Sequence, residues 1–208
     1  MKNLFQRLTG RPDAAEIDPD STLSTTMLPP FEPPVPVSWP VRAAELGAQP
    51  LDAVAAARQC LALWADEPEI AALGADAPQR LARVLGAATL PAGARPVQAD
   101  ETSPQVFVLL EGRLATEQRL TDGRTMPVAQ ARPGDVLCEP GGLDGGPRSA
   151  GCLCQGPCAV AVLPAEGLQQ LASQDAALAA ALYAVLARRL SLRLRHATAR
   201  LGALLAQP

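Results

Sequence analysis

The chain has 208 residues, of which 48% are hydrophobic and 19% charged, and its formal net charge is −3. This small negative charge excludes the overall positive field that is typical of nucleic-acid-binding proteins. No apolar run reaches the roughly 18 residues that a membrane span needs, and the first eight residues are too polar for a signal peptide, so we expect a cytoplasmic protein.

Residues 1–48 are rich in proline, serine, threonine and aspartate. Proline fixes φ and removes a hydrogen-bond donor, so we expect an extended or disordered arm here. Leu4, Phe5 and Leu8 lie at helical spacing within it. The arm is therefore a candidate docking peptide for a protein partner, and a plain disordered terminus is the alternative.

Residues 49–89 show apolar positions three and four apart, which predicts helices that pack on a following domain. Residues 90–165 then change to short runs with strand-like alternation, separated by turn signals. Asp122-Gly123, between Leu120 and Arg124, is a strong hairpin signal. The pattern predicts an α+β fold in which helices flank a small antiparallel β-roll.

Residues 166–208 are expected to form C-terminal helices, and the last is long and amphipathic. Its apolar stripe follows steps of four residues with one step of three, and consists of Leu178, Leu182, Leu186, Leu190, Leu194, Ala197, Leu201 and Leu205. A stripe of this length usually buries itself against a partner helix, and packing wholly on the chain's own roll is the alternative.

One acid and one base stand nine positions apart across a glycine-rich bend between Cys138 and Ala150. They are Glu139 and Arg148. A guanidinium and the backbone N–H groups of nearby glycines suit a phosphate, whereas a carboxylate accepts hydrogen bonds from sugar hydroxyls. A ribose cyclic phosphate offers both groups, and a solvated surface loop is the alternative interpretation.

This bend resembles the phosphate-binding cassette of cyclic nucleotide-binding domains, the family of the bacterial catabolite activators and of the regulatory subunits of cyclic-nucleotide-dependent kinases. The resemblance implies that Glu139 binds the ribose 2′-hydroxyl and that Arg148 binds the cyclic phosphate. The glycines, here Gly141 and Gly142, and Ser149 would add contacts. The chain departs from the family pattern at position 138, where cysteine replaces glycine.

The resemblance extends from about Leu73 to Leu201. It includes the strand motif that runs from Val106 to Leu114 and the Gly134-Asp135 corner that precedes the cassette. It implies a jelly-roll-like β-roll (a double-stranded β-helix) at 90–165, and a lid and dimerisation helix within 166–208 that forms a homodimer.

The resemblance also implies ligand contacts from that helix. Arg189 matches an arginine that reaches the ribose-binding carboxylate, and Arg193 and Leu194 replace the Thr-Ser pair that reads adenine in the catabolite activators. A guanine base, with acceptors at O6 and N7, suits an arginine better than adenine does. The ligand is therefore expected to be cAMP or cGMP.

Five cysteines, among them Cys152, Cys154 and Cys158, invite a metal or redox interpretation. Against it, a Cys-x-Cys pair in a strand places both sulfurs on one face, and buried free cysteine commonly behaves as a small hydrophobe. We expect the cysteines to pack in the core, with no metal site.

We expect a homodimeric cyclic nucleotide sensor or regulatory protein. Its single histidine, His196, and the lack of a Walker or dinucleotide motif argue against an enzyme. The sequence ends at Pro208, before the helix-turn-helix module that transcription factors of the family carry, so we expect no DNA binding. The alternative is a degenerate roll that binds no nucleotide and acts as a scaffold through its N-terminal arm.

Overall fold

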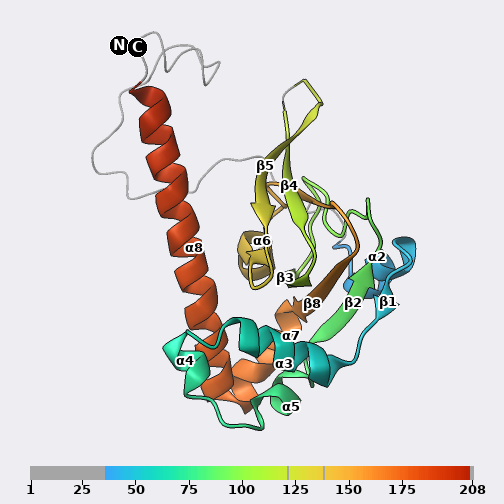
Figure 1. The fold of residues 1–208 in the computed structure, drawn as a ribbon, viewed down its shortest axis with the longest axis vertical. Coiled ribbons are helices and arrows are strands. Elements are labelled where there is room, and N and C mark those ends of the chain that lie inside the picture. Colours follow the sequence, from blue (N-terminus) through green and yellow to red (C-terminus); the bar gives the residue numbers. More distant parts are fainter. Residues whose placement is uncertain (1–35, 121, 138, 207–208) are drawn as a thin grey trace. The chain divides into compact units, whose positions relative to one another are not determined.

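The computed structural model describes residues 36–206 except 121 and 138, and the side chains of 139–141 lie outside the description. The docking peptide expected near the N-terminus and the departure at Cys138 therefore fall outside the described residues. Within the described ranges the fold is α+β, with antiparallel strands that form two sheets and helices that pack around them (Figure 1). The predicted fold class is confirmed.

The larger sheet has five strands in the order β1-β2-β8-β3-β6. Their bounds are β1 (Gln49–Pro50), β2 (Gly86–Leu90), β8 (Cys158–Pro164), β3 (Gln105–Glu111) and β6 (Val136–Leu137). The smaller sheet has the order β5-β4-β7, with β5 (Thr125–Ala131), β4 (Leu114–Arg119) and β7 (Gly151–Cys154). Every pairing is antiparallel.

Strand β3 separates two hydrophobic cores because successive side chains point to opposite faces of a sheet. Phe107 and Leu109 belong to the core between the two sheets, together with residues of β4, β7 and β8. Val106, Val108 and Leu110 belong to the core under the helices. Six consecutive residues of β3 are therefore buried, as expected for a strand that is covered on both faces.

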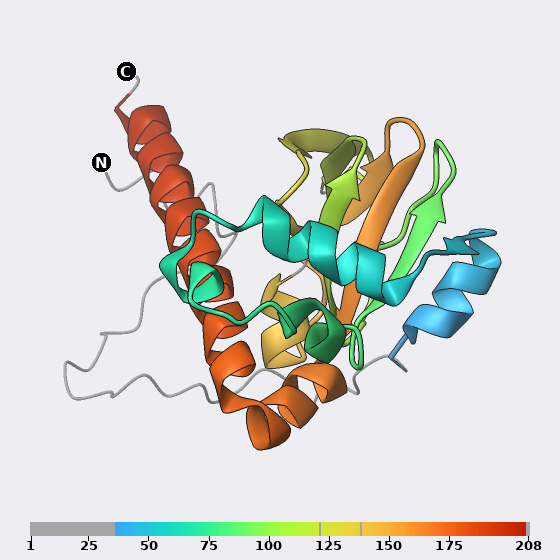
Figure 2. The ribbon, with the colours of Figure 1, turned by 60° about the horizontal axis from the view of Figure 1, so that its bottom comes forward.

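The helices cover the outer face of the larger sheet, and α3 crosses this face in Figure 2. They are α3 (Ala53–Leu63), α4 (Pro68–Ala71), α5 (Ala77–Leu81), α7 (Ala165–Gln174) and α8 (Ala176–Leu205). Asp52 caps α3 by accepting from the Ala55 N–H at 2.7 Å, and Asp175 caps α8 by accepting from the Leu178 N–H at 3.2 Å. None of the described helices combines the length and the apolar character that crossing a bilayer requires.

The predicted hairpin is present as β4 and β5. The Leu120 N–H donates to the Arg124 carbonyl at 2.7 Å, and the Arg124 N–H donates to Asp122 at 3.0 Å. Gly123 has φ +82°, a left-handed conformation that glycine adopts without a steric cost. The Asp-Gly signal therefore identified both the place and the chemistry of this turn.

The N-terminal arm ends earlier than residue 48, because α2 occupies Trp39–Glu45. Pro40 lies in the first turn of α2, where proline is tolerated because that N–H has no helical partner. The ring of Trp39 meets the ring of Phe107 edge to face, with centroids 5.4 Å apart, so burial against the roll holds the helix. The sheet also begins earlier than predicted, at β1 and at Gly86 of β2.

Candidate functional site

The glycine-rich bend folds into a short helix, α6 (Glu139–Asp144), which follows directly after β6 and packs on the beginning of β3. Gly142 makes this packing possible. A Cβ at this position would lie 2.6 Å from a methyl carbon of Val106 and 3.0 Å from the Gln105 carbonyl oxygen. The predicted phosphate-contacting glycine at 142 is thus held against β3.

Arg148 lies beyond the bend and is only 3% exposed. Its Nε donates to the Ser103 hydroxyl at 2.9 Å, and its Nη2 donates to the carbonyl oxygens of Ser103 and Gln105, the latter at 2.6 Å. The backbone of Arg148 also pairs with the same segment, since its N–H donates to the Glu101 carbonyl at 2.8 Å. Neutral oxygens of residues 101–105 therefore hold this guanidinium and its backbone.

Arg189 and Arg193, one turn apart on α8, reach the strand that leads into α6. Arg189 lies 3.6 Å from an Asp135 carboxylate oxygen and 3.9 Å from Glu67. Arg193 donates from Nη2 to the Val136 carbonyl at 2.8 Å. The two arginines thus fasten α8 to the chain directly before the bend.

A neighbouring arginine fastens α8 on its other side. Arg188 donates to both carboxylate oxygens of Glu69, at 3.0 and 3.2 Å, and also contacts Glu67. A backbone hydrogen bond at Glu69 and the bond from Arg188 lower the pKa of this carboxyl below its ordinary value. Since Glu69 belongs to α4, the middle of α8 is held between α4 and β6.

The sequence of residues 88–175 matches the family model of the cyclic nucleotide-binding domain, and this range contains most of β2, the strands from β3 to β8, the bend and all of α7. Residues 88–175 are therefore similar in sequence to a cyclic nucleotide-binding domain. The match also includes Arg148, whereas β1, α2, α3 and α8 lie outside it.

Solved structures share the fold. A cyclic nucleotide-binding domain from Methylobacillus flagellatus KT is 20% identical, with a TM-score of 0.65, and the match covers 74% of this chain and 86% of that one. The catabolite activator protein of Thermus thermophilus is 23% identical, with a TM-score of 0.55 and coverage of 66% and 62%. The regulatory domain of Toxoplasma gondii PKA, solved with cAMP, is 17% identical, with a TM-score of 0.51 and coverage of 66% and 50%.

These identities establish a common fold. The chain spans 62% of the Thermus thermophilus protein and half of the Toxoplasma gondii chain. No curated protein matches the chain in sequence.

Four of the predicted site residues fall into two groups. Gly142 and Arg148 converge on the carbonyl of Gln105, and Arg189 and Arg193 converge on residues 135–136. Ser149 is exposed to solvent. The side chain of Glu139 and position 141 lie outside the described side chains, so the expected carboxylate partner of the ligand stays a prediction.

Sequence reasoning missed the residues that hold Arg148. Ser103 and Gln105 are 1% and 3% exposed, and they lie more than 40 positions before the arginine. Serine and glutamine in a strand-like stretch carry no signal of such a partner. A buried polar pair directly before the apolar run of β3 is the one feature that could have drawn attention to them.

The four described cysteines, Cys60, Cys152, Cys154 and Cys158, are all buried. Cys152 and Cys154 of β7 belong to the core between the sheets, as the Cys-x-Cys spacing predicted. Burial, with a smaller contribution from nearby Cys158, raises the pKa of Cys154 to about 12. Among the described residues no cluster of three or more histidine, cysteine, aspartate or glutamate side chains is placed to hold a metal ion.

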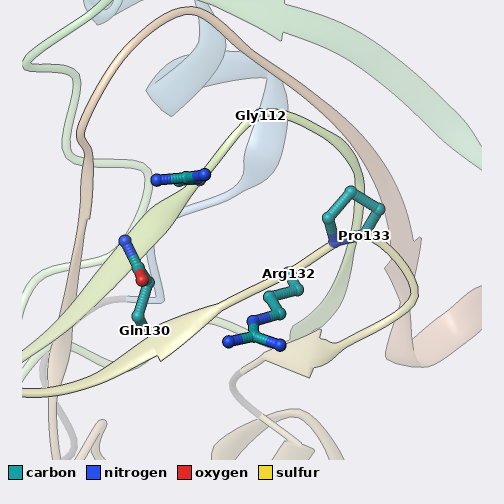
Figure 3. A pocket seen from close by; sticks show the side chains of 5 residues that line it. Gly112, Gln130, Arg132 and Pro133 are labelled. Carbon is teal, nitrogen blue, oxygen red and sulfur yellow. The ribbon is translucent and has the colours of Figure 1, made fainter.

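A cavity of about 420 Å³ opens at one end of the roll, between the β3–β4 and β5–β6 turns. Figure 3 shows Gln130 and Arg132 beside it, with Gly112 and Pro133 at the turns. None of its lining residues is a predicted site residue, and all of them are exposed. The cavity is therefore separate from the residues that surround α6.

Proposed function

We propose that this chain is a regulatory module that binds a cyclic nucleotide, cAMP or cGMP, at α6. Arg148 carries the proposal. It is a fully buried guanidinium at the end of the glycine-rich bend, and three of its hydrogen bonds go to neutral oxygens. Arginine stays charged at neutral pH, and its planar fork matches the oxygens of a phosphate, which accept more strongly than carbonyls.

The remaining contacts follow from the family pattern. Glu139 would accept from the ribose 2′-hydroxyl, and backbone N–H groups near Gly141 together with Ser149 would contact the phosphate. Arg189 and Arg193 would approach from α8, whose position beside β6 supports this arrangement. Arg193 favours guanine over adenine as the base, because an arginine donates to O6 and N7.

The regulatory output would be a change in assembly and not a chemical reaction. The exposed C-terminal half of α8 supports a homodimer, and the N-terminal arm would recruit an unidentified protein partner. Ligand binding would shift the population between two arrangements of α8 and the arm.

The test is calorimetry with cAMP, cGMP and a cyclic dinucleotide. Arg148→Ala should weaken binding of the preferred nucleotide by about 2–5 kcal/mol, and Glu139→Ala should weaken it by about 1.5–3 kcal/mol. Arg58→Ala, at an exposed position of α3, is the matched control and should bind as the parent does. Each variant is first melted without ligand, so that a folding defect is not mistaken for lost binding.

A second candidate function is a scaffold whose roll binds no nucleotide. The observation in its favour is that Arg148 is already engaged with Ser103 and Gln105. A melting temperature that is unaffected by every cyclic nucleotide would support the scaffold, because a ligand that binds only the folded state must raise it. A rise in melting temperature with any of them would instead support the sensor.

A further inference from the structure

The helix that precedes the roll is anchored to the segment 101–105. The Val37 N–H donates to the Thr102 carbonyl at 2.9 Å, and the Gln105 side-chain amide donates to the Val37 carbonyl at 3.2 Å. Arg42 of α2 forms an ion pair with Glu101. These polar contacts of residues 37–48, which include α2, all go to this one segment, and they add to the packing of Trp39 on Phe107; we refer to residues 37–48 as the α2 latch.

Arg148 is held by the same segment. It bonds to Ser103 and to the carbonyl of Gln105, while the amide of that same Gln105 reaches Val37. Its backbone N–H donates to the carbonyl of Glu101, whose side chain pairs with Arg42. Two residues of the segment, Glu101 and Gln105, thus contact both the latch and the phosphate-binding candidate.

The ion pair at the centre of the latch is buried but not completely satisfied. The side chains of Arg42 and Glu101 are 9% and 12% exposed. The Nε atom of Arg42 and the second carboxylate oxygen of Glu101 are buried without a hydrogen-bond partner. A buried charge pair with unsatisfied atoms contributes less than a complete one, because desolvation opposes its attraction. Such a contact separates more easily than the apolar core beside it.

We propose that a phosphate-bearing ligand at Arg148 releases the α2 latch. The inference rests on the proposed function and names the regulation of that same site. A phosphate that accepts from the Nε and Nη2 N–H groups displaces the oxygens of Ser103 and Gln105 that these groups now contact, so such a ligand draws the guanidinium away from the segment. The segment then loses the charged donors that fix two of its carbonyls, and its contacts with Val37 and Arg42 weaken.

The consequence concerns the N-terminal arm. The latch follows residues 1–36 directly in the sequence, so its release would change the attachment point from which this arm engages a protein partner. Coupling of this kind is reciprocal. If the ligand weakens the latch, then a weakened latch must strengthen ligand binding by the same factor.

Hydrogen–deuterium exchange on the full chain tests the release directly. Peptides that cover 37–48 are followed with and without a saturating amount of the nucleotide that gives heat in calorimetry. Exchange in these peptides should rise with ligand, while peptides from β8, in the centre of the larger sheet, should stay protected. Binding heat with unchanged or slower exchange at 37–48 overturns the latch and leaves the proposed function intact. An absence of heat with every cyclic nucleotide overturns both.

Arg42→Gln gives the reciprocal test, and Arg58→Gln on α3 is the matched control. Arg42→Gln should speed exchange at 37–48 without ligand and should tighten nucleotide binding by about fivefold, which lies within the usual range of coupling between sites. The control should change neither quantity. If Arg42→Gln speeds exchange but leaves the affinity unchanged, the two sites are not coupled and the proposal is wrong. If it proves too unstable to measure, Glu101→Gln replaces it with the same expected results.

Discussion

Gly142 and Arg148 both meet the carbonyl of Gln105, one from α6 and the other from the chain beyond it. The glycine permits close approach of backbones, and the arginine supplies a charged donor in a place that is closed to water. The beginning of β3 therefore contacts the bend at both positions. Backbone groups therefore position these two residues, and the residue types in the sequence do not indicate such contacts.

Replacing Gly142 by alanine should destabilise the protein by about 1–3 kcal/mol, the usual cost of overpacking. A Cβ there would lie 2.6 Å from the Val106 side chain, and this outweighs the gain of about 1 kcal/mol that alanine brings to a helix. Urea unfolding measures the change. Gly156→Ala is the control, since a Cβ at 156 has no atom within 4 Å. Equal stabilities for the two variants would contradict the packing role of Gly142.

Because of Cys60, the free energy of unfolding should decrease as the pH rises into the alkaline range. Burial raises the pKa of its thiol to about 12, whereas the thiol of an unfolded chain ionises near pH 8.5. Between these values the unfolded state has lost a proton that the folded state keeps. The free energy of unfolding should therefore fall by about 1.4 kcal/mol per pH unit on account of this group.

The contribution of Cys60 is fully present below about pH 8 and is lost as the pH rises toward the folded pKa. Urea unfolding under reducing conditions, at a series of pH values from about 8 to about 10, measures the slope. Cys60→Ala should show a shallower decline than the parent. Parallel declines would mean that Cys60 is not the group responsible.

At the level of elements, the sequence predicted the helices, strands and turns whose formation depends on residues close together in the chain. The alternation of β3, the Asp-Gly turn of the β4–β5 hairpin and the leucine stripe of α8 each lie within a short stretch, and each appears where it was expected. Helix α2 was not predicted, because its seven residues follow a proline-rich stretch and its stability comes from Trp39 against Phe107, 68 positions away. Such a contact leaves no periodic signal.

The candidate site divides in the same way. The acid and the base of the bend stand out within a short stretch of sequence, and the arginines of α8 were singled out by their resemblance to a family pattern; the ligand contacts of all of them stay predictions. The partners of these arginines could not be predicted, since Asp135, Val136, Ser103 and Gln105 come from other elements and offer carbonyls as often as side chains. Any residue type can present a carbonyl. The architecture around α6 is therefore a result of the tertiary fold.

At the scale of the whole molecule, α8 divides into two unequal environments. Leu178, Leu182 and Leu186 are at most 3% exposed in the core under the helices, whereas Leu194 and Leu201 are 68% and 57% exposed. The C-terminal half of the helix stands apart from the strands in both ribbon views (Figures 1 and 2). Residues 191–205 of α8 are therefore not buried against the chain's own roll, which excludes the alternative that the whole helix packs there.

The exposed half of α8 has the spacing of a coiled-coil seam. Steps of four, three, four and three residues connect five of the apolar positions at and beyond the start of this half, which are Leu190, Leu194, Ala197, Leu201 and Leu204. Alternating steps of this kind keep one stripe facing a partner helix along its length. A second copy of the same helix supplies a matching stripe, because a twofold interface uses the same patch on both subunits.

We therefore expect the chain to be a dimer in solution, and the double variant Leu194→Glu/Leu201→Glu to be a monomer. Burying like charges opposite each other opposes association, and these positions lie far from the buried half of α8, so the roll itself should stay folded. Light scattering coupled to size exclusion measures the mass, and far-ultraviolet circular dichroism verifies the fold.

Leu192→Glu is the control, because Leu192 is 47% exposed but lies two positions from Leu190, on the opposite side of the helix. A parent chain that elutes as a monomer at micromolar concentration, or a double variant that still dimerises, would show that α8 is not the interface. A monomeric Leu192→Glu would show instead that the seam has been assigned to the wrong side of the helix.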